Sequence, residues 1–243
     1  MPERLPVWLR KDLAPGHEAA RTDTLLKEQG LNTICESGRC PNRNECYSQR
    51  TATFMILGDV CTRSCGFCSV TQGKPGAADA DEPRRVAEAV RSLGLQHVVV
   101  TSVNRDDMAD EGAAHFVSVI ARLSALEPRP IIEILTPDFK RTQARAVEAI
   151  LAAGPDIFSH NTETVPRLYA RVRPQAHYAT SLALFREINR RSPRTLTKSG
   201  LMLGLGETRD EVFEVLRDLR SAGCDILTLG QYLRSDPLGL PVE

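Results

Sequence analysis

Three cysteines, Cys61, Cys65 and Cys68, form the pattern in this sequence that most clearly points to chemistry. Their C-x₃-C-x₂-C spacing follows directly on the apolar run Phe54–Leu57, which we predict to be a short buried strand. Iron–sulfur clusters are held by cysteine thiolates, and a cubane cluster normally takes four. Three close thiolates, called here the loop triad, therefore predict a [4Fe–4S] cluster with one open iron. A zinc knuckle or unrelated thiols are the alternatives, although zinc ligands usually come in two pairs.

A second group of three cysteines, the extension triad, precedes the first. Cys35, Cys40 and Cys46 are spaced C-x₄-C-x₅-C, and the glycine, proline and asparagines among them predict a loop. Turning backbone allows nearby thiolates to converge on one cluster. Because Cys46 lies only fifteen residues before Cys61, we expect a second metal site here.

Composition narrows the class of protein. A chain of 243 residues suits one α/β domain with an extension. Lysine plus arginine equals aspartate plus glutamate at 31 each, so charge gives no argument for a nucleic acid or an anionic membrane as partner. No apolar run is long enough to span a bilayer, and the first residues lack a secretory signal core, so we expect a cytoplasmic protein. Seven cysteines in such a chain favour metal ligation over disulfides, and the lone Cys224 receives no ligand role.

After the loop triad, apolar strands alternate with amphipathic helices. We predict a helix at 18–28 before the triads, and later helices at 83–93, around 116–123, at 142–153, 163–169 and 180–190, and from 208 to about 222. The predicted strands are 54–57, 97–101, 131–135, 156–159, 200–205 and 226–229. Six strands with intervening helices predict a parallel sheet with right-handed crossovers.

Several blocks of the sequence resemble the lipoyl synthase family of radical S-adenosylmethionine enzymes. C-x₃-C-x₂-C with an aromatic residue, Phe67, before its last cysteine is the signature of the wider superfamily. The blocks that resemble lipoyl synthases are 35–42 (Cys-Glu-Ser-Gly-Arg-Cys-Pro-Asn), 53–59, 101–107, 159–165, 197–208 and 230–233, and the resemblance runs from about Trp8 to Glu243. It implies a partial (β/α)₆ TIM-type barrel at 53–230, an extension at 1–52 carrying auxiliary-cluster cysteines, and a tail at 231–243.

The resemblance also implies an activity, the insertion of two sulfur atoms at carbons six and eight of an octanoyl chain on a carrier lysine. Those C–H bonds are unactivated, so a carbon radical is needed to break them. The share of the protein is to bind and orient the reacting groups. Cys61, Cys65 and Cys68 would hold the cluster that cleaves adenosylmethionine, two molecules per lipoyl group. The extension triad would hold an auxiliary [4Fe–4S] cluster that is consumed as sulfur donor. The implied partners are octanoylated lipoyl domains of 2-oxo acid dehydrogenases or glycine cleavage H protein, and ferredoxin or flavodoxin as electron donor.

Further candidate residues stand where the predicted strands end. In a β/α barrel the reactive groups gather at the carboxyl ends of the strands. Carboxylates suit the ribose diol and amine of adenosylmethionine, arginine suits its carboxylate, and glycines let backbone approach the adenine. We therefore expect a cofactor pocket that includes Arg105, Asp107, Glu163, Gly204, Gly206 and Glu207.

Each candidate has a structural alternative. Arg105 and Asp107 could form an ordinary loop ion pair, and the two glycines could simply shape a turn. His160 is either a hydrogen-bonded structural histidine or a proton shuttle. The sequence leaves open whether Glu133, which interrupts an apolar strand, faces the barrel interior or solvent, and Lys198 is equally open.

The last residues differ from the pattern of the family. Lipoyl synthases continue beyond the position of Glu243 to an Arg-Ser-Ser segment whose serine is the fourth ligand of the auxiliary cluster, and Arg234-Ser235 does not match it. We therefore expect impaired lipoyl formation even if both clusters assemble. The alternative functions are a truncated, catalytically impaired protein that binds iron–sulfur clusters and adenosylmethionine, or another two-cluster radical enzyme of sulfur insertion or methylthiolation.

Overall fold

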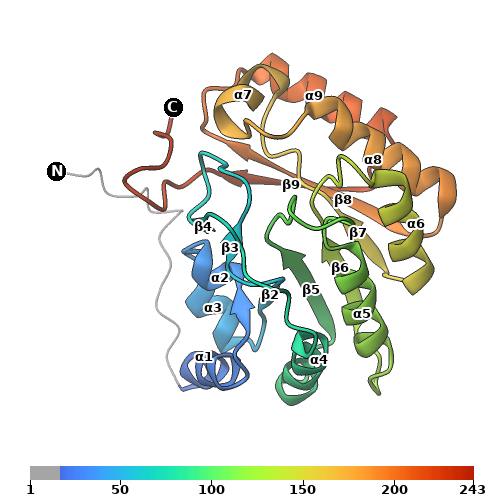
Figure 1. Cartoon of the computed structure of the whole chain (residues 1–243). Coiled ribbons are helices and arrows are strands. Elements are labelled where there is room, and N and C mark those ends of the chain that lie inside the picture. The colour runs from blue at the N-terminus through green and yellow to red at the C-terminus, as the bar shows by residue number, and fades with distance from the viewer. Residues whose placement is uncertain (1–16) are drawn as a thin grey trace.

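One curved sheet of parallel strands, added in sequence order, forms the body of the molecule (Figure 1). The computed structural model describes residues 17–243, so Trp8, where the resemblance begins, lies outside the described part. The parallel strands are β2 (Thr53–Ile56), β5 (His97–Ser102), β6 (Ile131–Leu135), β7 (Ile157–Ser159), β8 (Leu196–Leu203) and β9 (Ile226–Gln231). Each pairs in parallel with the next. The predicted partial barrel of six strands is confirmed.

Helices cover the outer face of this sheet, as Figure 1 shows. They are α4 (Glu82–Leu93), α5 (Ala113–Ser124), α6 (Gln143–Ala153), α8 (Tyr178–Arg191) and α9 (Arg209–Ser221). Their apolar residues recur at helical spacing and are buried against the strands, as Val86 and Val90 of α4 illustrate. Gly94, at φ 64°, ends α4 in the left-handed conformation that glycine tolerates. Thr208 and Glu211 form the predicted capping box at the start of α9.

The segment after β7 departs from the prediction. A helix over 163–169 was expected, but the chain first runs beside β8 and turns helical only at the 3₁₀ turn Pro166–Leu168 and α7 (Tyr169–Val172). Glu163 has a φ of 65°, which is outside the helical region. Its N–H donates to the Gly200 carbonyl at 3.0 Å, and its carbonyl accepts from the Met202 N–H at 2.9 Å. Pairing with the neighbouring strand has therefore replaced helix at this point.

The amino-terminal extension packs on the β2 edge of the sheet (Figure 1). It consists of α1 (Glu18–Glu28), β1 (Asn32–Thr33), α2 (Ile34–Ser37) and α3 (Arg43–Ser48), with β1 antiparallel to β2. The prediction of a loop across the extension triad was wrong in part. Cys35 lies on α2 and Cys46 on α3, and Cys40 alone stands between the two helices. The Thr33 hydroxyl accepts from the Glu36 N–H at 3.2 Å and so starts α2.

Buried hydrogen bonds join the parts of this extension. The Tyr47 hydroxyl, on α3, lies 2.8 Å from the Thr33 hydroxyl, and the Thr22 hydroxyl of α1 donates to the Tyr47 carbonyl at 2.9 Å. All three side chains are buried. The two short helices that carry cysteines are thus held by a few specific bonds between elements.

The barrel interior contains a polar cluster on the amino-terminal side of the cavity described below. Glu133 is 3 % exposed and accepts hydrogen bonds from Lys198 Nζ at 2.8 Å and from the Ser159 hydroxyl at 2.9 Å. Its second oxygen lies 3.1 Å from His97 Nε2. Glu133 is on the same face of β6 as Leu135, which lines the cavity, so it faces inward. The sequence left open where the side chains of Glu133 and Lys198 lie. The structure shows that they pair with each other.

None of the helices in residues 17–243 has the length and the apolar content that a membrane-spanning helix requires.

Candidate functional site

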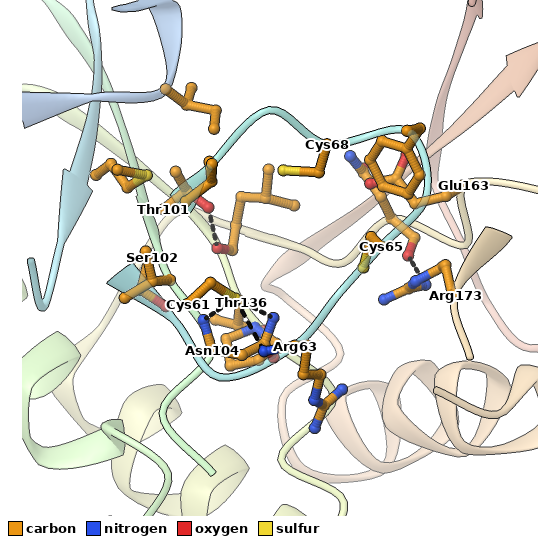
Figure 2. Close-up of a pocket in the computed structure, with 18 of the residues that line it drawn as sticks. Cys61, Arg63, Cys65, Cys68, Thr101, Ser102, Asn104, Thr136, Glu163 and Arg173 are labelled. Atoms are coloured by element: carbon orange, nitrogen blue, oxygen red, sulfur yellow. Dashed lines mark hydrogen bonds between the residues drawn. The ribbon is translucent and has the colours of Figure 1, made fainter. Parts of the chain in front are cut away.

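A cavity of about 220 Å³ lies at the carboxyl ends of the first four barrel strands. All three cysteines of the loop triad line it, as Figure 2 shows. Strand β5 contributes Thr101 and Ser102 to the wall, and the segment after β6 contributes Thr136. The remaining lining residues are Ile34, Met55, Arg63, Phe67, Val70, Gln72, Val103, Asn104, Leu135, Pro137, His160, Asn161, Glu163 and Arg173. The loop triad therefore opens onto the place where a β/α barrel carries its reactive groups.

A strained turn directs the chain from β2 into the loop triad. Leu57 has a φ of 68°, which a branched side chain rarely adopts, and Gly58 follows at 92°. The Leu57 N–H donates to the buried Glu82 carboxylate at 2.8 Å, and its carbonyl accepts from Arg105 at 3.4 Å. His115 Nε2 lies 2.7 Å from the same Glu82 oxygen. Charged side chains thus hold both backbone groups of the strained residue.

Backbone N–H groups point at the sulfur of Cys61. The N–H of Arg63 donates to it at 3.4 Å and the N–H of Asn104 at 3.3 Å. Burial raises the pKa of Cys65 to about 11, although the nearby Arg173 opposes the shift, and burial also raises the pKa of Cys68. Without metal these two thiols keep their protons at neutral pH, so cluster binding would release them.

The donor set fits an iron–sulfur cluster better than a single ion. Within residues 17–243, no three thiol, imidazole or carboxylate groups converge on a point where one metal ion could bind. The thiolates of a cubane cluster bind different irons, so such convergence is not required of them. Three free thiols on one cavity wall, with N–H groups directed at one sulfur, are the arrangement that a cluster with three protein ligands needs.

The extension triad is not part of the cavity lining, although the residue before Cys35 reaches the wall. Cys35 is buried on α2, and its carbonyl accepts from the Cys40 N–H at 3.0 Å. Burial raises the pKa of the Cys35 thiol. The residue before it, Ile34, lines the cavity. The extension therefore contributes Ile34 to the cavity wall, whereas Cys35, Cys40 and Cys46 are not among the lining residues.

Of the six residues expected to bind adenosylmethionine, Glu163 alone lines the cavity. Burial raises the pKa of its carboxyl group, and Arg173 partly offsets the shift. Arg173 is 9 % exposed and donates through Nη1 to the Asn161 carbonyl at 2.7 Å. Its Nε has no hydrogen-bond partner among residues 17–243. Glu163 and Arg173 together give the cavity one carboxylate and one guanidinium (Figure 2).

His160 also lines the cavity, but its two nitrogens are already used. Nδ1 lies 2.9 Å from the Thr136 carbonyl and Nε2 lies 2.9 Å from the Ser181 hydroxyl. Because a carbonyl oxygen only accepts, Nδ1 carries the proton and Nε2 accepts from Ser181. Burial lowers the pKa of His160 to about 4, and Arg173 adds to the effect. The structural alternative for this histidine is the one that the contacts support.

The structure places Arg105 and Asp107 outside the cavity wall. Arg105 donates to the two carboxylate oxygens of Asp107 at 2.9 and 2.8 Å and to the Gly76 carbonyl at 3.0 Å. With its bond to the Leu57 carbonyl, it ties together three segments near the strained turn. The ion pair that we considered as the alternative is the arrangement found.

Gly204, Gly206 and Glu207 also lie outside the cavity lining. The Glu207 carboxylate accepts from the N–H groups of Gly204 and Leu205 at 2.5 and 2.9 Å, which braces a turn. Gly204 and Gly206 have φ of 105° and 100°, so the turn requires glycine at both positions. The Glu243 N–H donates to the Gly204 carbonyl at 3.0 Å, so the tail residues 231–243 pack over this turn.

Sequence reasoning gave no role to two arginines of the cavity wall. Arg63 stands between two cysteines of the loop triad, and that position was the only signal for it. Arg173 follows α7 directly and precedes Pro174, where a basic residue is common at the end of a helix. Neither stands directly after a barrel strand, the position at which we predicted cofactor-binding residues.

Comparison with known proteins defines the class first. The model of the Radical SAM superfamily matches residues 55–219. A crystal structure of methylornithine synthase superposes with a TM-score of 0.60 over 96 % of this chain and 69 % of its own, at 15 % identity. HydG, a maturase of the [FeFe]-hydrogenase, gives 0.61 over 95 % of this chain and 58 % of its own, at 13 % identity. These two structures share the fold, and the chain belongs to the radical SAM superfamily.

Curated relatives then define the family. The lipoyl synthase of Caldanaerobacter subterraneus subsp. tengcongensis is 52 % identical over 96 % of this chain and 81 % of its own length. The lipoyl synthase of Methylococcus capsulatus is 52 % identical over 99 % of this chain and 75 % of its own. The chain is a member of the lipoyl synthase family, the radical SAM enzymes that insert sulfur. Membership brings with it adenosylmethionine, a [4Fe–4S] cluster and a protein-bound octanoyl substrate.

Proposed function

We propose that this enzyme inserts sulfur at carbons six and eight of an octanoyl chain on a carrier lysine, with the two cysteine triads in different roles. The observation that carries the proposal is the cavity beside the loop triad. Its wall holds Cys61, Cys65 and Cys68 together with Ile34, the residue before Cys35 on α2. We infer that a substrate in this cavity lies against the loop triad and close to the helix that carries Cys35.

The loop triad is proposed to hold the cluster that acts on adenosylmethionine. When bound, that cluster supplies an electron that cleaves the sulfonium to give a carbon radical able to remove hydrogen from unactivated C–H bonds. The contribution of the chain is to hold the thiolates and to keep the reacting groups away from water. N–H donors to the Cys61 sulfur are a means of tuning the potential of such a cluster.

The polar wall is proposed to bind adenosylmethionine. The Arg173 guanidinium, with its unpaired Nε, suits the methionine carboxylate, and the Glu163 carboxylate suits the amine or the ribose diol. The unpaired hydroxyls of Ser102 and Thr136 line the same cavity and offer further polar contacts. We propose an indirect role for five residues that brace the loops and the turn beside the pocket. They are Arg105, Asp107, Gly204, Gly206 and Glu207.

The apolar wall is proposed to receive the aliphatic substrate. Ile34, Met55, Val70 and Leu135 come from the extension, β2, the loop triad segment and β6, and all line the cavity. An octanoyl chain has no polar group beyond its amide, so burial against these side chains is the interaction open to it. Ile34 lies on α2 next to Cys35, so an octanoyl chain packed against Ile34 would come near Cys35.

The extension triad is proposed to hold a second [4Fe–4S] cluster that is consumed as the sulfur source. Cys35, Cys40 and Cys46 lie within one short helix–loop–helix segment. We further propose lipoyl domains of 2-oxo acid dehydrogenases or glycine cleavage H protein as octanoyl carriers, and ferredoxin or flavodoxin as electron donor. A cytoplasmic setting belongs to the same proposal, since a chain with seven cysteines, six of them in two proposed metal-binding triads, suits a reducing compartment.

An anaerobic assay with a short octanoyl-lysine peptide tests the proposal. The reconstituted enzyme is incubated with adenosylmethionine and dithionite, and peptide and nucleoside products are measured by mass spectrometry. We expect 5′-deoxyadenosine together with peptide that has gained sulfur, and an acetyl-lysine peptide should gain none. Deoxyadenosine with the octanoyl peptide unchanged would contradict the proposed sulfur transfer from the extension triad and would favour the alternative of a catalytically impaired protein that binds the clusters and adenosylmethionine.

A further inference from the structure

Arg63 is the centre of a buried charge network inside the loop triad. It stands between Cys61 and Cys65, and its side chain is 3 % exposed. Nε and Nη2 donate to the two carboxylate oxygens of Asp106, each at 2.8 Å, and Nη2 also donates to Asp138 at 2.8 Å. One guanidinium thus bridges two carboxylates (Figure 2 shows Arg63 at the cavity).

The two carboxylates belong to different barrel units. Asp106 lies in the segment after β5 and Asp138 in the segment after β6. Thr62 adds to the first of these links, because its hydroxyl lies 2.8 Å from the Asp106 carboxylate and its N–H donates to the Asn104 carbonyl at 3.1 Å. The middle of the loop triad is therefore fastened to the carboxyl ends of two adjacent strands.

The same residues surround the sulfur of Cys61. The backbone N–H of Arg63 and that of Asn104 are its two closest donors, at 3.4 and 3.3 Å. A shift of the Arg63 side chain away from its carboxylates would move the first donor. It would also separate the loop from the segment that supplies the second.

We infer that Arg63 is a positioning residue, which fixes the cluster-binding loop relative to the cavity side chains that bind adenosylmethionine. The inference rests on the proposed role of Cys61, Cys65 and Cys68 as cluster ligands. Arg63 acts through the loop, because its Nε and Nη2 are engaged by Asp106 and Asp138. Asp138 is 1 % exposed, so it would be left as an unpaired buried carboxylate without Arg63.

The geometry requires arginine in particular. A planar guanidinium can donate two parallel bonds to one carboxylate and a third to another, whereas a lysine ammonium is a single point of charge. Burial favours loss of the Arg63 charge, but Asp106 and Asp138 outweigh it and raise the pKa of the guanidinium. Arg63→Lys therefore keeps the charge and removes the bridge.

The test compares Arg63→Lys with a matched control, Arg191→Lys. Arg191 also bridges two carboxylates, Glu148 at 2.9 Å and Glu187 at 2.5 Å, but on the outer helices α6 and α8. Three quantities are measured on the anaerobically reconstituted full chain: iron per chain, the dissociation constant of adenosylmethionine, and the change in the EPR spectrum of the reduced cluster when adenosylmethionine is added. The EPR change reports the fit between cofactor and cluster, which overall stability does not affect.

We expect Arg63→Lys to keep its iron, to bind adenosylmethionine at least about tenfold more weakly, and to lose most of the EPR change. Arg191→Lys should match the unaltered enzyme in all three. An Arg63→Lys protein with unaltered affinity and unaltered EPR change would overturn the inference. Failure of the unaltered enzyme to bind the cluster or adenosylmethionine would instead refute the proposed function.

A second variant decides the matter if Arg63→Lys does not fold. Asp106 is 26 % exposed and Asp138 only 1 %, so Asp106→Ala removes the less buried of the two carboxylates and leaves the Arg63–Asp138 pair. We expect folded protein with weaker adenosylmethionine binding and a reduced EPR change. Folded Asp106→Ala protein that behaves like the unaltered enzyme would also overturn the inference.

Discussion

The two cysteine triads differ in how the fold supports them. The loop triad follows β2, the first of the six barrel strands, and Arg63 within it pairs with Asp106 and Asp138 of the next two units. The extension triad has Cys35 and Cys46 on two short helices and Cys40 between them, and it is held by the buried Tyr47–Thr33 pair and by packing of Cys35 and Tyr47 in the main core. The first site is held by charged side chains from two neighbouring units, and the second by local hydrogen bonds and apolar contacts.

This difference matches the work proposed for each triad. A cluster that serves in every turnover gains from a fixed position, because small displacements are costly to radical chemistry. A cluster that is dismantled to give up sulfur needs thiolate ligands that can dissociate from its irons. With these proposed roles, the buried Arg63 bridge braces the site at which the cofactor must be held, and the ligand set that must come apart lies on the extension.

Separate removal of each triad gives the largest effect. Cys65→Ala should abolish both 5′-deoxyadenosine and lipoyl product, whereas Cys40→Ala should abolish the lipoyl product alone. Each variant should fall from about eight irons per chain to about four, as expected for loss of one cubane. Iron analysis with product analysis by mass spectrometry checks both. Deoxyadenosine from Cys65→Ala would break the proposed division of labour.

His160 is buried on the loop triad side of the molecule. We therefore predict that it makes the free energy of unfolding depend on pH. Its pKa is about 4 in the folded chain, against about 6.5 when unfolded, so below pH 6.5 the unfolded chain takes up a proton that the folded chain does not. Stability should therefore fall by about 1.4 kcal/mol per pH unit as pH drops from 6.5 towards 4. Urea unfolding at several pH values measures the slope.

The matched control for that slope is His177→Gln, since His177 is exposed at the start of α8. It should leave the slope as it is, whereas His160→Gln should flatten it. An unchanged slope in His160→Gln would show that other groups cause the pH dependence.

Glu163→Gln sharpens the comparison within the cavity. Loss of its negative charge should weaken adenosylmethionine binding about tenfold, since charge-assisted hydrogen bonds are the strong ones. Glu207→Gln is the control, because its carboxylate braces the turn at Gly204. Isothermal titration calorimetry of both variants gives the dissociation constants. An equal loss in Glu207→Gln would place that turn in direct contact with the cofactor.

Tyr47→Phe gives the smallest effect and tests the extension alone. It removes the hydroxyl that pairs with Thr33, at a cost of about 1 kcal/mol. We expect lower iron occupancy of the extension triad on mild chelation and normal adenosylmethionine cleavage. Tyr178→Phe, which loses a hydroxyl bond to Asp218 on the outer helices, is the control. Equal loss of iron from both triads would show that the two sites are not supported independently.

Much of the fold could be predicted because helix and strand periods differ. Pro83 and Gly94 bounded α4, and the capping box at Thr208 marked α9, so local chemistry gave the order of the elements. The helix predicted at 163–169 is not found, because the backbone of Glu163 pairs with β8 instead. No local pattern records such a pairing.

The site was harder to predict than the fold. The cysteine spacings show on the sequence itself, so both triads were found. The hydrogen bonds of Arg63 are made to carboxylates more than forty residues away, and Arg105 pairs with Asp107, two residues further on. Glu133 shows the same limit, because a strand buried on both faces carries no alternation that reveals which way a residue points.

The most direct test of the account follows the sulfur itself. The full chain is reconstituted with sulfide of a heavy isotope, freed of excess sulfide, and allowed one turnover with octanoyl-lysine peptide, beside Cys40→Ala treated in the same way. We expect the unaltered enzyme to give peptide that carries heavy sulfur. Cys40→Ala should give deoxyadenosine without sulfur-bearing peptide. Heavy-sulfur peptide from Cys40→Ala would contradict the role given to the extension triad.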